Sequence, residues 1–450
     1  MLYSTHASDT GVNLSSYSMS ARFTSDRLRL AGTLVLALIL VTTGSFIRER
    51  APDEYGSLDW VVIAQLGLAL AGGCFGLLLL RRHSLSGFGA RVLTAYILAI
   101  LIAALFSPYL FQVMGYWILL AGACVLCMGL VSSSRTEMAL RDIERAILST
   151  VSFMLLKDTL VDAFYFRTQV DRMEELGIGM YRFGMGSTSS NAMGLLAAVA
   201  FCMSFKSASG RRFGSFWGSL WPGFFTIVLL LTRTRIALFA LVVSSVVRWW
   251  FRRRARNVSS DSALVGFPCL AGGIVLVLIM AWLWNVPLVT GAVDFVNRGA
   301  DSGTIGTVTG RTDVWSYALK RIFESPTATA FGHGYGVSKL VLNENNWTAS
   351  WSATHSHNTF LESVLSTGLM GTLPLVVLII YSLGWLYRFW WMSRAFSLPF
   401  RLRAVMVVSA VLSSTMTESD LVTKIGPALI IYLFYVLSLD RHAAFLQPRC

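Results

Sequence analysis

Two histidines in a polar segment are the first residues of this chain whose types and spacing could do chemistry. His355 and His357 are followed by Asn358 and then by an apolar, helix-like run that contains Glu362. Imidazole, with an unperturbed pKa of about 6.5, can take a proton from a hydroxyl group near neutral pH. This spacing could also begin a metal site, but no third ligand follows at standard spacing, and His333 or Glu362 could join only through folding. The pattern therefore favours a catalytic histidine, His357, over a metal site.

Arginines at the edges of apolar segments are the second feature. Arg233 and Arg235 stand between two apolar runs, and Arg311 immediately precedes a predicted amphipathic helix, Thr312–Glu324. An arginine at membrane depth costs about 2.5–3.5 kcal/mol and by default marks a substrate or ion pathway. A guanidinium beside the free N–H groups of a helix N-terminus suits an anion such as phosphate. The alternatives are that Arg233 reaches lipid phosphates and that Arg311 pairs with Asp313 in solvent.

The composition shows what kind of scaffold must position these residues. Of 450 residues, 55% are hydrophobic and only 14% are charged, whereas soluble domains carry about a quarter charged residues. Crossing the hydrocarbon core takes about 20 apolar residues. The sequence predicts about twelve such spans, some of them short, at 28–47, 58–80, 91–106, 109–131, 143–164, 191–205, 216–231, 236–250, 264–284, 372–387, 404–416 and 422–439. We therefore predict an all-α fold, a polytopic helical membrane bundle with one large periplasmic loop that contains short helices.

The distribution of positive charge predicts the topology. The net charge of +13 comes from 37 lysines and arginines against 24 acidic residues. In a soluble protein this excess would suggest nucleic acid as a partner, but in a membrane protein cations first mark cytoplasmic loops. They gather in alternate loops, at residues 22–29, 81–83, 135–141, 206–212, 248–256, 388–403 and 441. This pattern places both termini in the cytoplasm and requires no nucleic acid.

One long polar loop interrupts the series of spans. It contains the predicted amphipathic helix, which Pro326 ends. The apolar face of that helix comprises Val314, Ala318 and Ile322, with Trp315 and Leu319 beside them. Loops longer than about 15 residues are usually functional or disordered, and here we expect an ordered lobe on the outer membrane surface.

The predicted organisation follows from the spans and this loop. A cytoplasmic tail at 1–27 precedes nine helices at 28–284, and the periplasmic lobe occupies 285–358. A short or re-entrant helix and the last three spans lie at 359–440, and a cytoplasmic tail follows at 441–450.

Several short motifs fall on the predicted outer face of the bundle. His357-Asn358 is followed, after nine residues, by Gly368-Leu369-Met370-Gly371. Before it come Ser190-Asn191, Thr234-Arg235-Ile236-Ala237, Gly310-Arg311-x-x-x-Trp315 and Phe331-Gly332-His333-Gly334. In type and order these motifs resemble those of the bacterial O-antigen ligases, a family that also groups polysaccharide polymerases and membrane oligosaccharyltransferases. The resemblance covers roughly the half of the chain from Asn191 to Glu418, and Thr234, where serine is commoner, keeps the hydroxyl.

The resemblance implies a transferase without metal or cofactor at the periplasmic face of the bacterial inner membrane. Its donor would be a glycan carried on undecaprenyl diphosphate among the membrane lipids. Its acceptor would be a sugar hydroxyl of the lipid A-core. A leaving diphosphate gains negative charge as the glycosidic bond breaks, so cationic groups must stabilise it.

The same resemblance implies a role for each motif residue. His357 would be the general base of an inverting single displacement. The pyrophosphate would be bound by Arg235 and Arg311, with Arg233. The supporting residues would be Asn358, which orients the imidazole or the acceptor, Asn191, which lines the cavity or caps its helix, and Glu362, which fixes a histidine tautomer.

Two other functions stay open at this stage. The related polymerases of O-antigen or exopolysaccharide use a second lipid-linked repeat as acceptor, and the tight histidine–asparagine motif leans only slightly toward a ligase. A transporter or flippase would also have many spans and intramembrane arginines. Transporters commonly show internal repeats, and the single late loop gives this sequence no such symmetry.

Overall fold

The computed structural model describes eleven stretches of the chain: residues 14–45, 59–82, 87–134, 136–175, 190–204, 215–232, 234–256, 311–343, 355–388, 396–415 and 426–446. Within these stretches the chain forms helices and turns and no strand, which confirms the all-α prediction. Helices suit an apolar solvent because every backbone group inside them is paired within the same segment.

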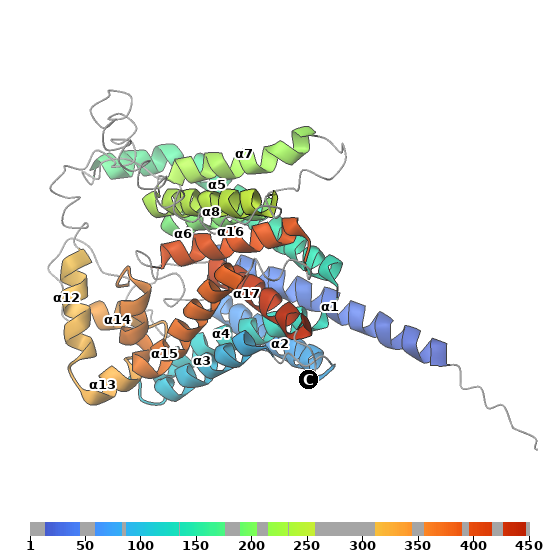
Figure 1. Cartoon of the computed structure of the whole chain (residues 1–450). Coiled ribbons are helices and arrows are strands. Elements are labelled where there is room, and N and C mark those ends of the chain that lie inside the picture. Colours follow the sequence, from blue (N-terminus) through green and yellow to red (C-terminus); the bar gives the residue numbers. More distant parts are fainter. Residues whose placement is uncertain are drawn as a thin grey trace, which may run out of the picture.

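The helices lie close to the apolar runs of the sequence (Figure 1). They are α1 (Leu14–Ser45), α2 (Trp60–Arg82), α3 (Phe88–Ala104), α4 (Leu110–Ser133), α5 (Glu137–Glu175), α6 (Ser190–Ser204), α7 (Ser215–Thr232), α8 (Arg235–Arg256), α12 (Arg311–Ile322), α13 (Pro326–Phe331), α14 (Ser338–Asn343), α15 (Thr359–Arg388), α16 (Leu398–Ser414) and α17 (Pro427–Leu446). Helices α1 and α5 are clearly longer than the spans predicted at 28–47 and 143–164. Helix α15 comprises two helical segments that meet at a kink at Gly368.

Four described helices are long and apolar enough to cross a membrane. They occupy Asp26–Gly44, Trp60–Arg82, Leu110–Ser133 and Thr359–Leu386. Shorter apolar helices lie at Phe88–Ala104, Ser190–Ser204, Leu220–Thr232 and Ile236–Phe251. The total of about twelve spans stays a prediction, and the predicted span at 264–284 lies outside the described residues.

Helices α3 and α15 run antiparallel and define the two ends of the bundle. At one end, the ring of Phe88 in α3 lies 5.0 Å from that of Tyr381 in α15. At the other end, the hydroxyl of Ser107, just after α3, donates a hydrogen bond to the carbonyl of His333. Helix α2 finishes at the first end with Arg81 and Arg82. We call this first end the arginine-rich end.

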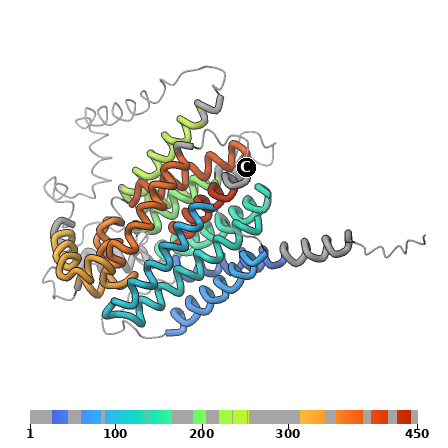
Figure 2. The backbone as a smooth tube through the Cα atoms, turned by 60° about the horizontal axis from the view of Figure 1, so that its bottom comes forward, coloured from blue at the N-terminus to red at the C-terminus, as the bar shows by residue number. Residues whose placement is uncertain are grey.

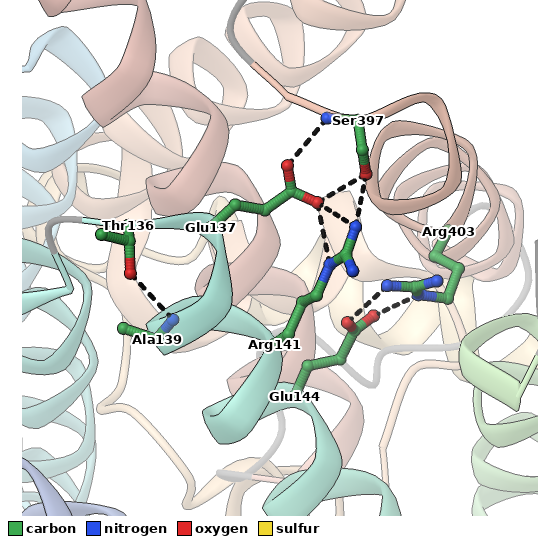
Figure 3. A network of polar contacts seen from close by, with 7 residues as sticks. All are labelled: Thr136, Glu137, Ala139, Arg141, Glu144, Ser397 and Arg403. Atoms are coloured by element: carbon green, nitrogen blue, oxygen red, sulfur yellow. Dashed lines mark hydrogen bonds and ion pairs between the residues drawn. The ribbon is translucent and has the colours of Figure 1, made fainter. Parts of the chain in front are cut away.

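Ion pairs join α5 to the start of α16 at the arginine-rich end (Figure 3). Glu137 accepts the N–H of Ser397 at 2.8 Å and pairs with Arg141 at 2.6 Å. Seven residues after Glu137 in α5, Glu144 binds Arg403 through both carboxylate oxygens, at 2.6 and 2.8 Å. Burial raises the pKa of Glu137, but hydrogen bonds from Ser397 and Arg141 outweigh it and leave that pKa below its usual value. The pairing therefore stabilises the fold above the ordinary pKa of glutamate and is lost as the pH falls through the lowered value.

Helices α2 and α4 pack closely because glycines line their contact. A methyl group on Gly122 would lie 2.2 Å from the carbonyl oxygen of Ala69, and one on Gly76 would lie 2.4 Å from that of Val125. Small residues let two membrane helices approach until their backbones touch.

Helices α12, α13 and α14 form a lobe at the end of the bundle opposite the arginine-rich end (Figures 1 and 2). The inner face of α12 is the predicted one, since Val314, Ala318 and Ile322 are all buried. Leu319 was expected beside this face, but it is 45% exposed and points away from it. Pro326 not only follows the end of α12 but also begins α13, a favoured position because proline lacks the N–H that a first helical turn leaves unpaired.

Candidate functional site

The segment from His355 to Asn358 is pinned to the bundle through its central serine. Ser356 is fully buried, and its N–H donates to Oε2 of Glu362 at 2.8 Å. Its carbonyl accepts a hydrogen bond from Nε1 of Trp315 at 2.7 Å, and its hydroxyl donates to the carbonyl of Asn358 at 3.1 Å. Every polar group of Ser356 therefore has a partner. These bonds hold the backbone between His355 and His357.

Asn358 begins the helix α15. Its Oδ1 atom accepts the N–H groups of Phe360 and Leu361, both at 3.0 Å. This is the pattern of a helix N-cap, for which asparagine and serine are among the preferred residues. The asparagine of the motif thus has a structural function in addition to any contact with the imidazole or the acceptor.

His357 has an unusual backbone conformation. Among the residues that the structure describes, it is the one that is not glycine and has a positive φ, 53°. Its ring lies 4.0 Å from that of His355, centroid to centroid, and both side chains are partly exposed. Such conformations cost free energy and cluster at functional sites, where surrounding contacts enforce them.

Glu362 is a buried carboxyl group beneath this segment. It has no exposed surface, and besides the Ser356 N–H it accepts the hydroxyl of Ser338 in α14 and, at 3.5 Å, that of Ser366 in α15. The sequence suggested that Glu362 fixes a histidine tautomer, and that role stays a prediction. The contacts show a structural task, because Glu362 ties α14 and α15 to the backbone between the two histidines.

Replacing Glu362 tests this task. In Glu362→Ala the Ser356 N–H and two buried hydroxyls lose their acceptor, and each unpaired buried group costs about 1–3 kcal/mol. We expect a clearly lower melting temperature and faster hydrogen exchange of the Ser356 amide, with Glu362→Gln intermediate because it keeps one oxygen. Asp142→Asn, in an exposed acidic residue, is the control. Unchanged exchange at Ser356 in Glu362→Ala would rule out the anchoring role.

Two glycines bring the lobe into direct contact with α15. Gly368 interrupts the helical geometry of α15 with a φ of 61°, and Gly332 ends α13 with a φ of 71°. A methyl group on Gly368 would lie 2.3 Å from the carbonyl of Ala330, and one on Gly332 would lie 2.5 Å from the nitrogen of Gly368. The N–H of His333 donates to the carbonyl of Leu365 at 2.9 Å across this contact. Glycine is needed at both positions because the two backbones touch.

Gly368→Ala is therefore expected to destabilise the protein by about 2–4 kcal/mol, through left-handed strain and the clash with Ala330. The melting temperature of the purified protein in detergent measures this. Gly384→Ala, in the same helix, is the matched control, because a methyl group there would meet nothing within 4 Å. Equal stability of the two variants would contradict this account of the motif glycine.

His333 links the lobe to α3 and α12. Its Nε2 atom lies 3.1 Å from the carbonyl oxygen of Arg321 and 3.6 Å from Glu324, and its own carbonyl accepts the Ser107 hydroxyl. No group of three or more histidine, cysteine or acidic side chains that could hold a metal occurs in the described part of the chain. His333 and Glu362 thus have structural partners of their own.

Arg235 is the first residue of α8, where that helix meets the start of α6. The hydroxyl of Thr234 donates to the carbonyl of Ser190 at 3.0 Å, so the backbones of Arg235 and Asn191 lie near one another. Asn191 is the second residue of α6. The side chain of Arg235 and the whole of Arg233 lie outside the described residues.

The start of α8 lies at the same end of the bundle as the start of α15. Helices α8 and α16 run antiparallel, since Phe251 late in α8 packs with Leu402 and Val405 early in α16. The far end of α16 reaches the histidine segment, where the carbonyl of Thr415 accepts the N–H of Thr359 at 3.0 Å. The motif-bearing helices α6, α8 and α15 therefore begin at this end of the bundle.

Arg311 begins α12 in the lobe at this same end (Figure 1). Trp315, one helical turn later, donates to the Ser356 carbonyl, so the start of α12 lies beside the histidine segment. The Arg311 side chain is outside the described part. The fold thus gathers the backbones of the motif residues at one end.

Residues 219–376 match the family model described as O-Antigen ligase. This range contains the start of α8, the lobe and the first two thirds of α15, and hence Arg235, Arg311 and His357. The chain is therefore similar to proteins of the O-antigen ligase/polymerase family. This match confirms the resemblance inferred from the motifs.

One curated protein to which the chain is similar is the Exopolysaccharide production protein ExoQ of Rhizobium meliloti (strain 1021). The two are 25% identical over 253 residues, which are 54% of this chain and 53% of ExoQ. The chain thus spans about half the length of the curated relative that it matches.

The serines around Glu362 and the contact between the two histidines were not predicted. Ser338 and Ser366 belong to no motif, and hydrogen bonds between residues 24 positions apart have no signature in sequence. The spacing of His355 and His357 was the available signal for their contact, and it was considered only as a metal pattern.

Proposed function

We propose that this protein is a membrane glycan transferase, which moves an undecaprenyl-diphosphate-linked glycan to a sugar hydroxyl at the periplasmic face, without metal or cofactor. The observation that carries the proposal is the family match over residues 219–376, whose helices begin beside the histidine segment. Likeness to this family supports a lipid-linked glycan as the substrate class, and the apolar helices support a membrane location.

In the proposed reaction His357 takes the proton of the acceptor hydroxyl. The hydroxyl oxygen forms a bond to the anomeric carbon of the donor while the bond from that carbon to the diphosphate breaks, which inverts the centre. The lipid diphosphate leaves with the electron pair. Arg235 and Arg311, with Arg233, stabilise its growing charge, because guanidinium groups match phosphate oxygens in geometry and charge.

The proposed orientation places the arginine-rich end in the cytoplasm of the bacterial inner membrane, with both termini on that side. Positive residues at the ends of α2 and α8 and at the start of α16 support this orientation. The histidine segment and the lobe would then face the periplasm, where the lobe forms part of the predicted domain at 285–358. Asn191 would border the same cavity.

Two acceptors are compatible with this chemistry. The close match to the histidine–asparagine motif favours lipid A-core, as in a ligase. The likeness to a protein named for exopolysaccharide production favours a second lipid-linked repeat, as in a polymerase. Deleting the gene separates the two, since loss of a ligase leaves polymer on the lipid carrier and loss of a polymerase leaves single repeats.

Reconstitution tests the transferase itself. Purified protein in liposomes, supplied with lipid-linked donor and either acceptor, is expected to form a new glycosidic bond and release undecaprenyl diphosphate. A transporter or flippase would move lipid-linked glycan between leaflets and form no such bond. That result, obtained with correctly folded protein and both acceptors, would end the proposal.

A further inference from the structure

The two imidazole rings of the histidine segment face each other. Their centroids are 4.0 Å apart and their planes are inclined by 48°. The serine between them is fully buried, whereas both histidines are partly exposed. The fold therefore presents the two rings together at the end of the bundle where the motif helices begin.

Buried hydrogen bonds and an unusual backbone conformation hold the segment that carries the two rings. The backbone of Ser356, between the two histidines, is held by Glu362 of α15 and by Trp315 of α12. His357 itself adopts a left-handed backbone conformation, with a φ of 53°. A contact that costs backbone strain and is enforced from two helices indicates a selected geometry.

The charge on the second ring decides what such a pair can do. If His357 acts as the base, it becomes an imidazolium cation during the reaction. A neutral aromatic face within about 6 Å of a cation attracts it, whereas a second cation at this distance would oppose proton uptake. Among the charged residues of the packed helices, Glu362 of α15 accepts the Ser356 N–H, and Arg311 and Asp313 stand at the start of α12. Lys320 and Arg321 lie further along α12, and Arg388 ends α15.

We propose that His355 is a positioning residue that holds the ring of His357 and, as a neutral ring, stabilises the imidazolium that forms on it. The inference rests on the proposed function, because it presupposes that His357 takes a proton. It adds to the site a residue that lies outside the histidine–asparagine motif.

Three replacements of His355 separate this role from its alternatives. His355→Ala removes the ring, and we expect kcat to fall about threefold to thirtyfold with the KM for the lipid-linked donor within twofold. His355→Phe keeps an uncharged aromatic face and should retain at least half of the wild-type kcat. His355→Lys introduces a fixed cation, and it should lower kcat at least as far as alanine does.

The pH profile gives the readout that a merely structural role would not move. A fixed cation beside His357 disfavours its protonated form, so the acid limb of kcat against pH should shift to lower pH in His355→Lys. In His355→Phe that limb should stay close to wild type. The assay is glycan transfer by the full-length protein in liposomes, with Arg145→Ala, an exposed residue at the arginine-rich end, as control.

The opposite pattern would overturn the inference. If His355→Lys kept the wild-type kcat and His355→Phe had a raised KM for the lipid-linked donor, His355 would instead be a cationic ligand of the diphosphate. Wild-type kinetics in His355→Ala would leave the ring without a role. In both cases wild-type protein still transfers glycan, so the proposed function stands; absence of transfer by wild-type protein would instead defeat that function.

Discussion

His357→Asn is expected to reduce glycan transfer by about 10²- to 10⁴-fold, the usual contribution of a general base. Asparagine is the informative replacement because it tolerates the left-handed conformation that His357 adopts, with a φ of 53°. The helix cap at Asn358 and the anchoring of Ser356 should then persist, and the loss can be assigned to the missing imidazole. The rate is measured with purified protein in liposomes, with excess lipid-linked donor and acceptor.

Rescue by free imidazole is the control for this loss. His357→Gly also suits a positive φ and leaves space for an added base, so imidazole in the assay should restore part of the transfer. Melting temperatures of both variants should stay close to wild type. Wild-type rates in a folded His357→Asn protein would exclude His357 as the base.

Arg235→Ala is expected to lower transfer about ten- to a hundredfold, since a hydrogen bond to a charged group contributes about 1.5–3 kcal/mol. Arg311→Ala should have a similar effect. The double variant should lose less than the product of the two, because both side chains would bind one diphosphate and their contributions would not be independent. Transfer rates at saturating and limiting donor measure these losses.

Arg253→Ala is the matched control for Arg235→Ala. It lies in the same helix, α8, near the arginine-rich end, and its side chain is exposed, with the guanidinium over the ring of Trp249. We expect this variant to transfer glycan like wild type. Full activity of Arg235→Ala alongside this control would remove Arg235 from the proposed diphosphate site.

The position of the helices could be predicted largely from the apolar runs. The run at 109–131 became α4, Leu110–Ser133, and the run at 191–205 became α6, Ser190–Ser204. The sequence separates a short helix from the following span, and the kink at Gly368 divides α15 into two helical segments, since a left-handed residue normally ends a helix. The close contact of this kink with α13 was not predicted, because it depends on the tertiary fold.

In the candidate site too, the features set by neighbouring residues could be predicted, and those set by contacts between distant residues could not. The histidine–asparagine motif could be located from sequence, and asparagine before an apolar run is also a helix-start signal. The structural role of Glu362 could not be predicted from the sequence, because it depends on the packing of α14 against α15. The hydrogen bond from Trp315 to Ser356 joins residues 41 positions apart, and only the tertiary fold brings them together.

The backbone contact between Gly332 and Gly368 has a consequence for protein engineering. Chimeras that exchange outer segments between relatives would be the natural way to look for determinants of acceptor choice. Exchanging residues 311–343 alone would place the Gly332 turn of another protein against the Gly368 kink of this one. The contact between these two segments leaves no room even for a methyl group. Productive junctions should therefore lie before Arg311 and after Gly371, so that both halves of the crossing come from the same parent.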